Sequence, residues 1–210
     1  MNWPGKDRWQ SLWKKAGVPE APTAWHERLT SAYAEPHRYY HNQRHIAECL
    51  VEFDEAQHLS DNAVAIELAL WFHDAVYDPR AADNEEQSVV LLKRCAAETS
   101  LAHSFVKTVC ELVIATKHHS SDTNPDASLI IDIDLSIFGK GKERFCEYEE
   151  QIRQEYAWVP EPLFSSKRAE ILERFLARNA IYATEWFRKK YERQARHNLE
   201  VSILELRRRT

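Results

Sequence analysis

The stretch Ala69-Leu70-Trp71-Phe72-His73-Asp74-Ala75-Val76-Tyr77 places an imidazole and a carboxylate side by side within what otherwise resembles a buried helix. Burying either group without a partner is costly, and an unpaired carboxylate in an apolar interior costs several kcal/mol. A bound metal ion would compensate both groups. The stretch therefore predicts a metal site to which other segments of the chain add ligands.

The composition indicates a helical protein. The chain has 210 residues and only four glycines, which is long enough for a substantial core and favours helix over tightly turned sheet. We predict an all-α fold, a single compact bundle of eight to ten helices forming one domain over residues 1–210. The metal-site core is expected over about residues 38–135, with the C-terminal helices packing on it.

Two segments leave local alternatives. Residues 129–135 alternate in polarity as a strand would, but no partner strand is evident, so a short helix is expected. Pro160 and Pro162 are expected to interrupt the chain, with the next helix capped at Ser165 or Ser166.

Charge and hydropathy exclude several classes of protein. The formal net charge is −5, which gives no general signature of binding to nucleic acid or to an anionic membrane. No apolar run approaches the ~18 residues of a membrane span, and the N-terminal residues lack an apolar signal core. A cytoplasmic location is therefore expected.

The cysteines predict no zinc finger and no disulfide. None of them forms a CxxC pair, and each lies in an apolar helical pattern, so buried thiols in a reducing compartment are expected. The four are Cys49, Cys95, Cys110 and Cys146.

The candidate metal ligands come from three distant segments, each at the edge of an apolar helix face. They are His45, His73, Asp74 and Asp134. Two imidazoles and two carboxylates suit a divalent Mn, Mg, Fe, Co, Ni or Zn ion. Four protein ligands on an octahedral ion would leave two positions for water and a substrate oxygen, the condition for hydrolysis.

Five motifs in order resemble the HD-domain superfamily of metal-dependent phosphohydrolases. More narrowly, they are similar to a bacterial group described as predicted metal-dependent HD phosphohydrolases. The motifs are Tyr39-Tyr40-His41-Asn42-Gln43-Arg44-His45, Trp71-Phe72-His73-Asp74-Ala75-Val76-Tyr77-Asp78, Asp83-Asn84-Glu85-Glu86-Gln87-Ser88, Ala115-Thr116-Lys117-His118-His119 and Asp132-Ile133-Asp134-Leu135. The HD dipeptide alone is weak, whereas the five motifs in order are specific.

The resemblance implies roles for single residues. His45, His73, Asp74 and Asp134 would be the metal ligands, with Asp132 a rival for the last place. Asp74 would also orient the attacking water. His41 is a candidate general acid by analogy with cyclic-nucleotide phosphodiesterases, and its alternative is an exposed or capping residue.

Further residues of these motifs suit a phosphate. Lys117 and Arg38 could stabilise charge on phosphoryl oxygens. His119 matches an imidazole of some family members, and the adjacent His118 would point about 100° away on a helix. Glu85 could hold a water or a second metal, or be a first-turn helix acid. Asp78, before Pro79, could belong to the site or to a turn.

We therefore expect a metal-dependent hydrolase acting on phosphate esters of nucleotides or related small molecules. The chain lacks the extra His and Asp residues of the cyclic-nucleotide enzymes and the GYP motif of the cyclic-dinucleotide branch. The alternatives are a metal-containing regulatory or ligand-binding domain without turnover, and a di-iron HD-type oxygenase. A homodimer is possible if Trp9, Trp13 and Trp186 form an interface, and a core position is the other interpretation of these residues.

Overall fold

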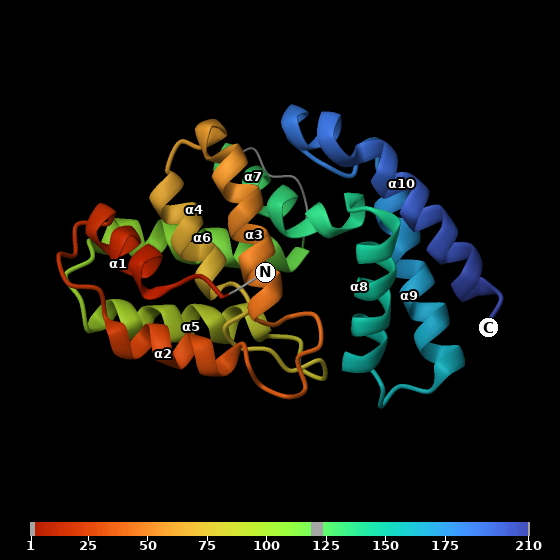
Figure 1. The fold of residues 1–210 in the computed structure, drawn as a ribbon, viewed down its shortest axis with the longest axis horizontal. Coiled ribbons are helices and arrows are strands. Elements are labelled where there is room, and N and C mark those ends of the chain that lie inside the picture. Colours follow the sequence, from red (N-terminus) through yellow and green to blue (C-terminus); the bar gives the residue numbers. More distant parts are fainter. Residues whose placement is uncertain (1–2, 119–123, 210) are drawn as a thin grey trace. The chain divides into compact units, whose positions relative to one another are not determined.

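A computed structural model describes residues 3–118 and 124–209, and the regular structure within them is entirely helical (Figure 1). It comprises ten α-helices and two short 3-10 helices, η1 and η2. Their bounds are α1 Lys6–Lys15, α2 Thr23–Ala32, α3 Gln43–Ala56, η1 Gln57–Leu59, α4 Ala63–Phe72, α5 Asn84–Ala97, α6 His103–His118, α7 Pro125–Asp134, η2 Leu135–Gly139, α8 Lys142–Glu155, α9 Glu161–Leu176 and α10 Glu185–Arg207. The predicted all-α class and helix number are confirmed, and the segment at 129–135 begins as helix.

The chain forms two compact units, Met1–Ile133 and Asp134–Thr210. The single domain over residues 1–210 stays a prediction. Within the described ranges, no helix combines the length and the apolar character that a membrane crossing requires.

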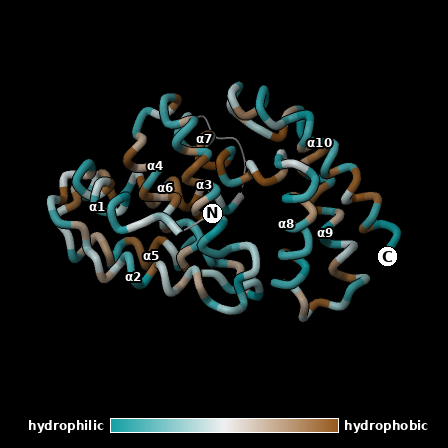
Figure 2. The backbone as a smooth tube through the Cα atoms, viewed as in Figure 1, coloured by the Kyte–Doolittle hydropathy of each residue, from teal (hydrophilic) through white to brown (hydrophobic). Residues whose placement is uncertain are grey.

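Helix α4 is the central element of the first unit and packs against α1, α3, α5 and α6. Every residue from Ala65 to Phe72 is buried, as expected for a helix that is hydrophobic on all sides, and Figure 2 shows its hydrophobic colouring. Asn62 caps its N-terminus by accepting a hydrogen bond from the Ala65 amide at 3.1 Å. The helix therefore gives a rigid base to the residues that follow it.

The HD pair lies at the end of α4 and not inside a helix, which corrects the prediction. The helix ends at Phe72, with His73 as its C-cap. The carbonyls of Asp74 and Ala75 accept hydrogen bonds from the Arg38 guanidinium, and the Val76 amide donates to Ser88 Oγ. These partners replace the intrahelical hydrogen bonds that would otherwise extend the helix.

The aromatic residues near the N-terminus form part of the core. Trp9 and Trp13 are buried, and Trp9 contacts Trp71 at 5.1 Å between ring centroids. The core interpretation is therefore confirmed for these two tryptophans, whereas Trp186 is partly exposed.

In the second unit, α9 begins earlier than predicted. It starts at Glu161, with Pro160 as N-cap and Pro162 in the first turn, so the predicted cap at Ser165 or Ser166 is wrong. Proline is compatible with the first turn because its missing amide hydrogen has no intrahelical acceptor there.

Close packing of η2 against α10 makes Gly139 sensitive to substitution. A Cβ atom built on Gly139 would lie 2.6 Å from Tyr191 Cγ and 2.7 Å from Cδ1, and closer still to Cβ. We expect Gly139→Ala to lower the free energy of unfolding by about 1–3 kcal/mol, the usual cost of overpacking. Gly141→Ala is the matched control, because its Cβ would meet nothing within 4 Å. Urea unfolding of both variants measures the difference, and equal stability would contradict this packing.

Candidate metal centre

The first two candidate ligands are His45, on α3, and His73, the C-cap of α4, and these two helices pack against each other. His45 lies in the first turn of α3, which Asn42 caps by accepting a hydrogen bond from the Arg44 amide at 2.8 Å. Its neighbours on the buried face include Ile46, Cys49 and Leu50. The cap and this apolar face fix where the His45 ring enters the core.

Three ligand atoms converge within the first unit. The Nε2 atoms of His45 and His73 lie 3.1 Å apart. Asp74 Oδ2 lies 3.1 Å from His73 Nε2 and 3.3 Å from His45 Nε2. Two ligand atoms bound to one ion at ~2.1 Å lie roughly 3.0–3.4 Å apart in octahedral or tetrahedral geometry. The spacing therefore fits a single divalent ion, and both imidazoles are almost fully buried.

The hydrogen bonds of His73 indicate which ring nitrogen is available. Its Nδ1 lies 3.0 Å from the carbonyl oxygen of Leu70, which can only accept, so Nδ1 carries the hydrogen and donates. In the neutral ring, Nε2 then keeps its lone pair and faces His45 and Asp74. Metal-binding histidines typically have this arrangement, with the second nitrogen held by a carbonyl or carboxylate.

Asp74 is ionised despite its burial. Burial alone would raise the pKa of its carboxyl group, but without a metal the positive charge of protonated His73, hydrogen bonds from His45 and His73, and the positive charge of protonated His41 outweigh it. The pKa of Asp74 is therefore held well below its usual range. The group is thus an anionic ligand at neutral pH, as a metal site requires.

A wider group of possible ligands includes Cys49, whose sequence pattern predicts an ordinary core thiol. One donor atom each from His45, Cys49, His73 and Asp134 can be chosen so that all lie within 4.8 Å of one another. Cys49 Sγ lies 3.7 Å from His45 Nδ1 and 3.8 Å from Nε2. The sequence itself indicates this proximity, because Cys49 follows His45 at i+4 and residues at this spacing share one helix face.

Asp134 is the last residue of α7, whose preceding residues belong to the first unit. It belongs to the possible ligand group, and the rival Asp132 does not, although Asp132 is fully buried. The two side chains are about 200° apart around the helix axis, so only one of them can face a given site. The other cysteines lie outside this group, and Cys146 is exposed on α8, which corrects its predicted burial.

His41 lies beside the three converging atoms. Its ring stacks on Tyr77 with centroids 4.2 Å apart and is 5.8 Å from the ring of His45. The ring is half-buried. The structure thus places an imidazole at the edge of the centre, as a proton donor would require.

Arg38 was expected to contact a phosphate, but its guanidinium is buried and engaged within the protein. It donates to the carbonyl oxygens of Asp74 at 2.6 Å, Ala75 at 3.1 Å and His41 at 3.3 Å, and to the Glu35 carboxylate at 2.9 Å. Its side chain is 1% exposed. Arg38 therefore ties the turn that carries Asp74 to the segment that carries His41.

The other residues predicted to belong to the site are Lys117, Asp78, Glu85 and His119. The Lys117 ammonium donates to Glu86 and to the carbonyl oxygen of Ala82, and its hydrogen bond to Glu86 raises its pKa. Asp78 accepts from the Arg80 amide at 2.9 Å and exchanges hydrogen bonds with Asn84, so it builds a turn. Glu85 is half-buried in the first turn of α5. His119 lies outside the described residues, as does the side chain of His118.

Comparison of the chain with protein-family models, with curated proteins and with solved structures finds no match.

Proposed function

We propose that the protein is a metal-dependent phosphohydrolase of the HD type. The convergence of His45 Nε2, His73 Nε2 and Asp74 Oδ2 within 3.3 Å supports the proposal most directly. A divalent ion held there would polarise a phosphoryl oxygen and lower the pKa of a water molecule. The resemblance of the five motifs favours a phosphate ester of a nucleotide or related small molecule as substrate.

The chain's own residues would contribute orientation and proton transfer. Ionised Asp74 would accept a hydrogen bond from the attacking water and hold its direction toward phosphorus. His41, at the edge of the centre, would hold the proton that the leaving oxygen needs. Arg38 would hold His41 and Asp74 in a fixed position relative to each other through its hydrogen bonds to their backbone carbonyls.

Metal analysis coupled to an activity screen tests the proposal. The protein is purified without added metal, its metal content is measured, and hydrolysis of p-nitrophenyl phosphates and nucleoside phosphates is followed. Chelation should abolish turnover, and one of Mn, Mg, Fe, Co, Ni or Zn should restore it. Metal-loaded protein that hydrolyses none of these esters would contradict the proposal, and iron content with oxygen consumption would indicate a di-iron oxygenase.

The position of Cys49 favours a second candidate, a metal-stabilised binding domain without turnover. Structural zinc sites are closed tetrahedral sites rich in cysteine, and Cys49 lies within the possible ligand group. In that case Cys49→Ser should release zinc and reduce the thermal stabilisation by metal, about 1.4 kcal/mol for each tenfold loss of affinity. For the hydrolase, Cys49→Ser should keep its metal and most of its activity.

Cys95→Ser is the matched control for this comparison. Cys95 is equally buried on α5 and lies outside the ligand group. Both substitutions place a hydroxyl in an apolar site, so a difference in bound metal between them reports ligation and not packing.

A further inference from the structure

A cavity of about 950 Å³ lies between α5 and α6 in the first unit. Its volume is within the usual range of small-molecule sites. None of its lining residues belongs to the candidate metal centre. The lining residues are Val89, Lys93, Ala96, Ala97, Leu101, His103, Val106, Lys107, Cys110, Glu111, Ile114 and Ala115.

Most of the residues that line this cavity are aliphatic, and none of them is Phe, Tyr or Trp. Small side chains on both helices, Ala96 and Ala97 on α5 and Ala115 on α6, leave the space between them open. Along α6 the lining runs from His103 to Ala115, roughly 18 Å at 1.5 Å per residue. An elongated, mainly aliphatic groove without Phe, Tyr or Trp side chains suits a flexible alkyl chain better than a flat ring.

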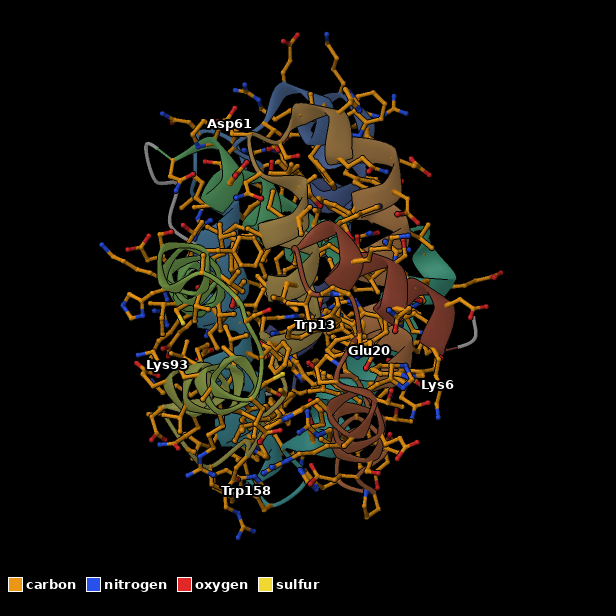
Figure 3. The ribbon with its side chains drawn as sticks, turned by 90° about the vertical axis from the view of Figure 1, so that its left-hand side faces the viewer. Lys6, Trp13, Glu20, Asp61, Lys93 and Trp158 are labelled. Atoms are coloured by element: carbon orange, nitrogen blue, oxygen red, sulfur yellow. The ribbon has the colours of Figure 1, made fainter. Side chains whose placement is uncertain are left out.

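The charges at this groove are mainly positive, although the whole chain carries a net charge of −5. Lys93 and Lys107 lie on opposite helices, and the acid among the lining residues, Glu111, pairs with Lys107 at 3.7 Å. Within the described part of the chain, Lys93 makes no hydrogen bond or ion pair. Burial raises the pKa of the Cys110 thiol, so this neighbour supplies no negative charge. Figure 3 views the two helices nearly end-on, with Lys93 labelled at their outer side.

We propose that the α5–α6 groove binds a free long-chain carboxylate, with its alkyl chain on the aliphatic floor and its carboxylate beside Lys93. The charge of the groove is complementary to this headgroup, and the mainly aliphatic lining favours an alkyl chain over a sugar or a base. This site is separate from the proposed metal centre, so either proposal can fail without the other.

Calorimetric titration with dodecanoate, below the concentration at which it forms micelles, tests the proposal. Affinity should rise about threefold to fourfold for each methylene from octanoate to dodecanoate, because each buried methylene contributes ~0.8 kcal/mol. Lys93→Glu should weaken dodecanoate binding at least about threefold, as expected for reversal of an exposed charge pair. Ala96→Trp should fill the groove and abolish binding.

Arg94→Glu is the matched control, because Arg94 is the next residue on α5, is exposed and lies outside the lining. It makes the same change of charge but points about 100° away. Unchanged affinity in this variant supports the site, whereas an equal loss in Arg94→Glu and Lys93→Glu would overturn it. Absence of dodecanoate binding to the wild-type protein, or equal binding of dodecyltrimethylammonium, would also overturn it. Circular dichroism verifies that Ala96→Trp protein is folded. Lys93→Glu changes only an exposed residue, so it tests the proposal even if Ala96→Trp protein does not fold.

Discussion

His73→Ala protein is expected to fold, to lose its bound metal and to lose phosphoesterase activity by more than about a hundredfold. Even the groups that orient a metal ligand are worth about 10- to 100-fold in affinity or activity, and His73 is itself a ligand in the proposed site. Its Nε2 is 3.1 Å from both His45 Nε2 and Asp74 Oδ2, so its removal opens one side of the centre.

Thermal unfolding separates this effect from simple loss of structure. Without metal, His73→Ala removes one polar side chain from the closely spaced group of His45, His73 and Asp74. The apo protein should therefore remain folded. The increase in melting temperature on adding metal should disappear, because that increase depends on binding to the native state. His197→Ala is the control, since it removes an exposed imidazole from α10.

Retention of metal-dependent stabilisation and of turnover in His73→Ala protein would show that the site lies elsewhere. A different result would favour the metal-stabilised binding domain. In that result, His73→Ala protein loses its stabilisation by metal, and the wild-type protein shows no turnover. The two candidate functions are therefore distinguished by the same pair of measurements.

The sequence predicts the apolar framework well because that framework depends on periodicity. The run that became α4 is buried on every side. His45 and His73 could be identified as candidate ligands because each is an imidazole at the edge of an apolar pattern. Their Nε2 atoms meet because α3 and α4 pack against each other.

Three features of the site were not predicted, each for a physical reason. Cys49 was assigned to the core because a buried thiol and a ligand thiol have the same sequence pattern, although its i+4 spacing from His45 was visible. The end of α4 depends on Arg38, which is distant in sequence and binds backbone carbonyls that have no sequence signature. Arg38 was assigned to a phosphate because its sequence context shows a charge and not its partners.

Arg38→Ala is expected to destabilise the protein and to weaken metal binding, although Arg38 contacts no metal ligand atom. The substitution leaves the carbonyls of Asp74 and Ala75 without the donors that satisfy them. A buried carbonyl without a partner costs about 1–3 kcal/mol, so the two together cost roughly 2–6 kcal/mol. That corresponds to a fall in melting temperature on the order of 10 °C, and metal affinity should fall because Asp74 is no longer held in place.

Arg38→Lys distinguishes positioning from phosphate binding. Lysine keeps the charge but lacks the planar fork that reaches several carbonyls at once, so a positioning role predicts that Arg38→Lys loses stability and metal affinity nearly as Arg38→Ala does. Direct phosphate binding predicts instead a raised KM with unchanged melting temperature and metal affinity. Arg94→Ala, which removes an exposed guanidinium from the same unit, should leave all three quantities unchanged. Because Arg38 joins the carbonyls of His41 and Asp74, its loss should also shift the pH profile of turnover if His41 supplies the proton.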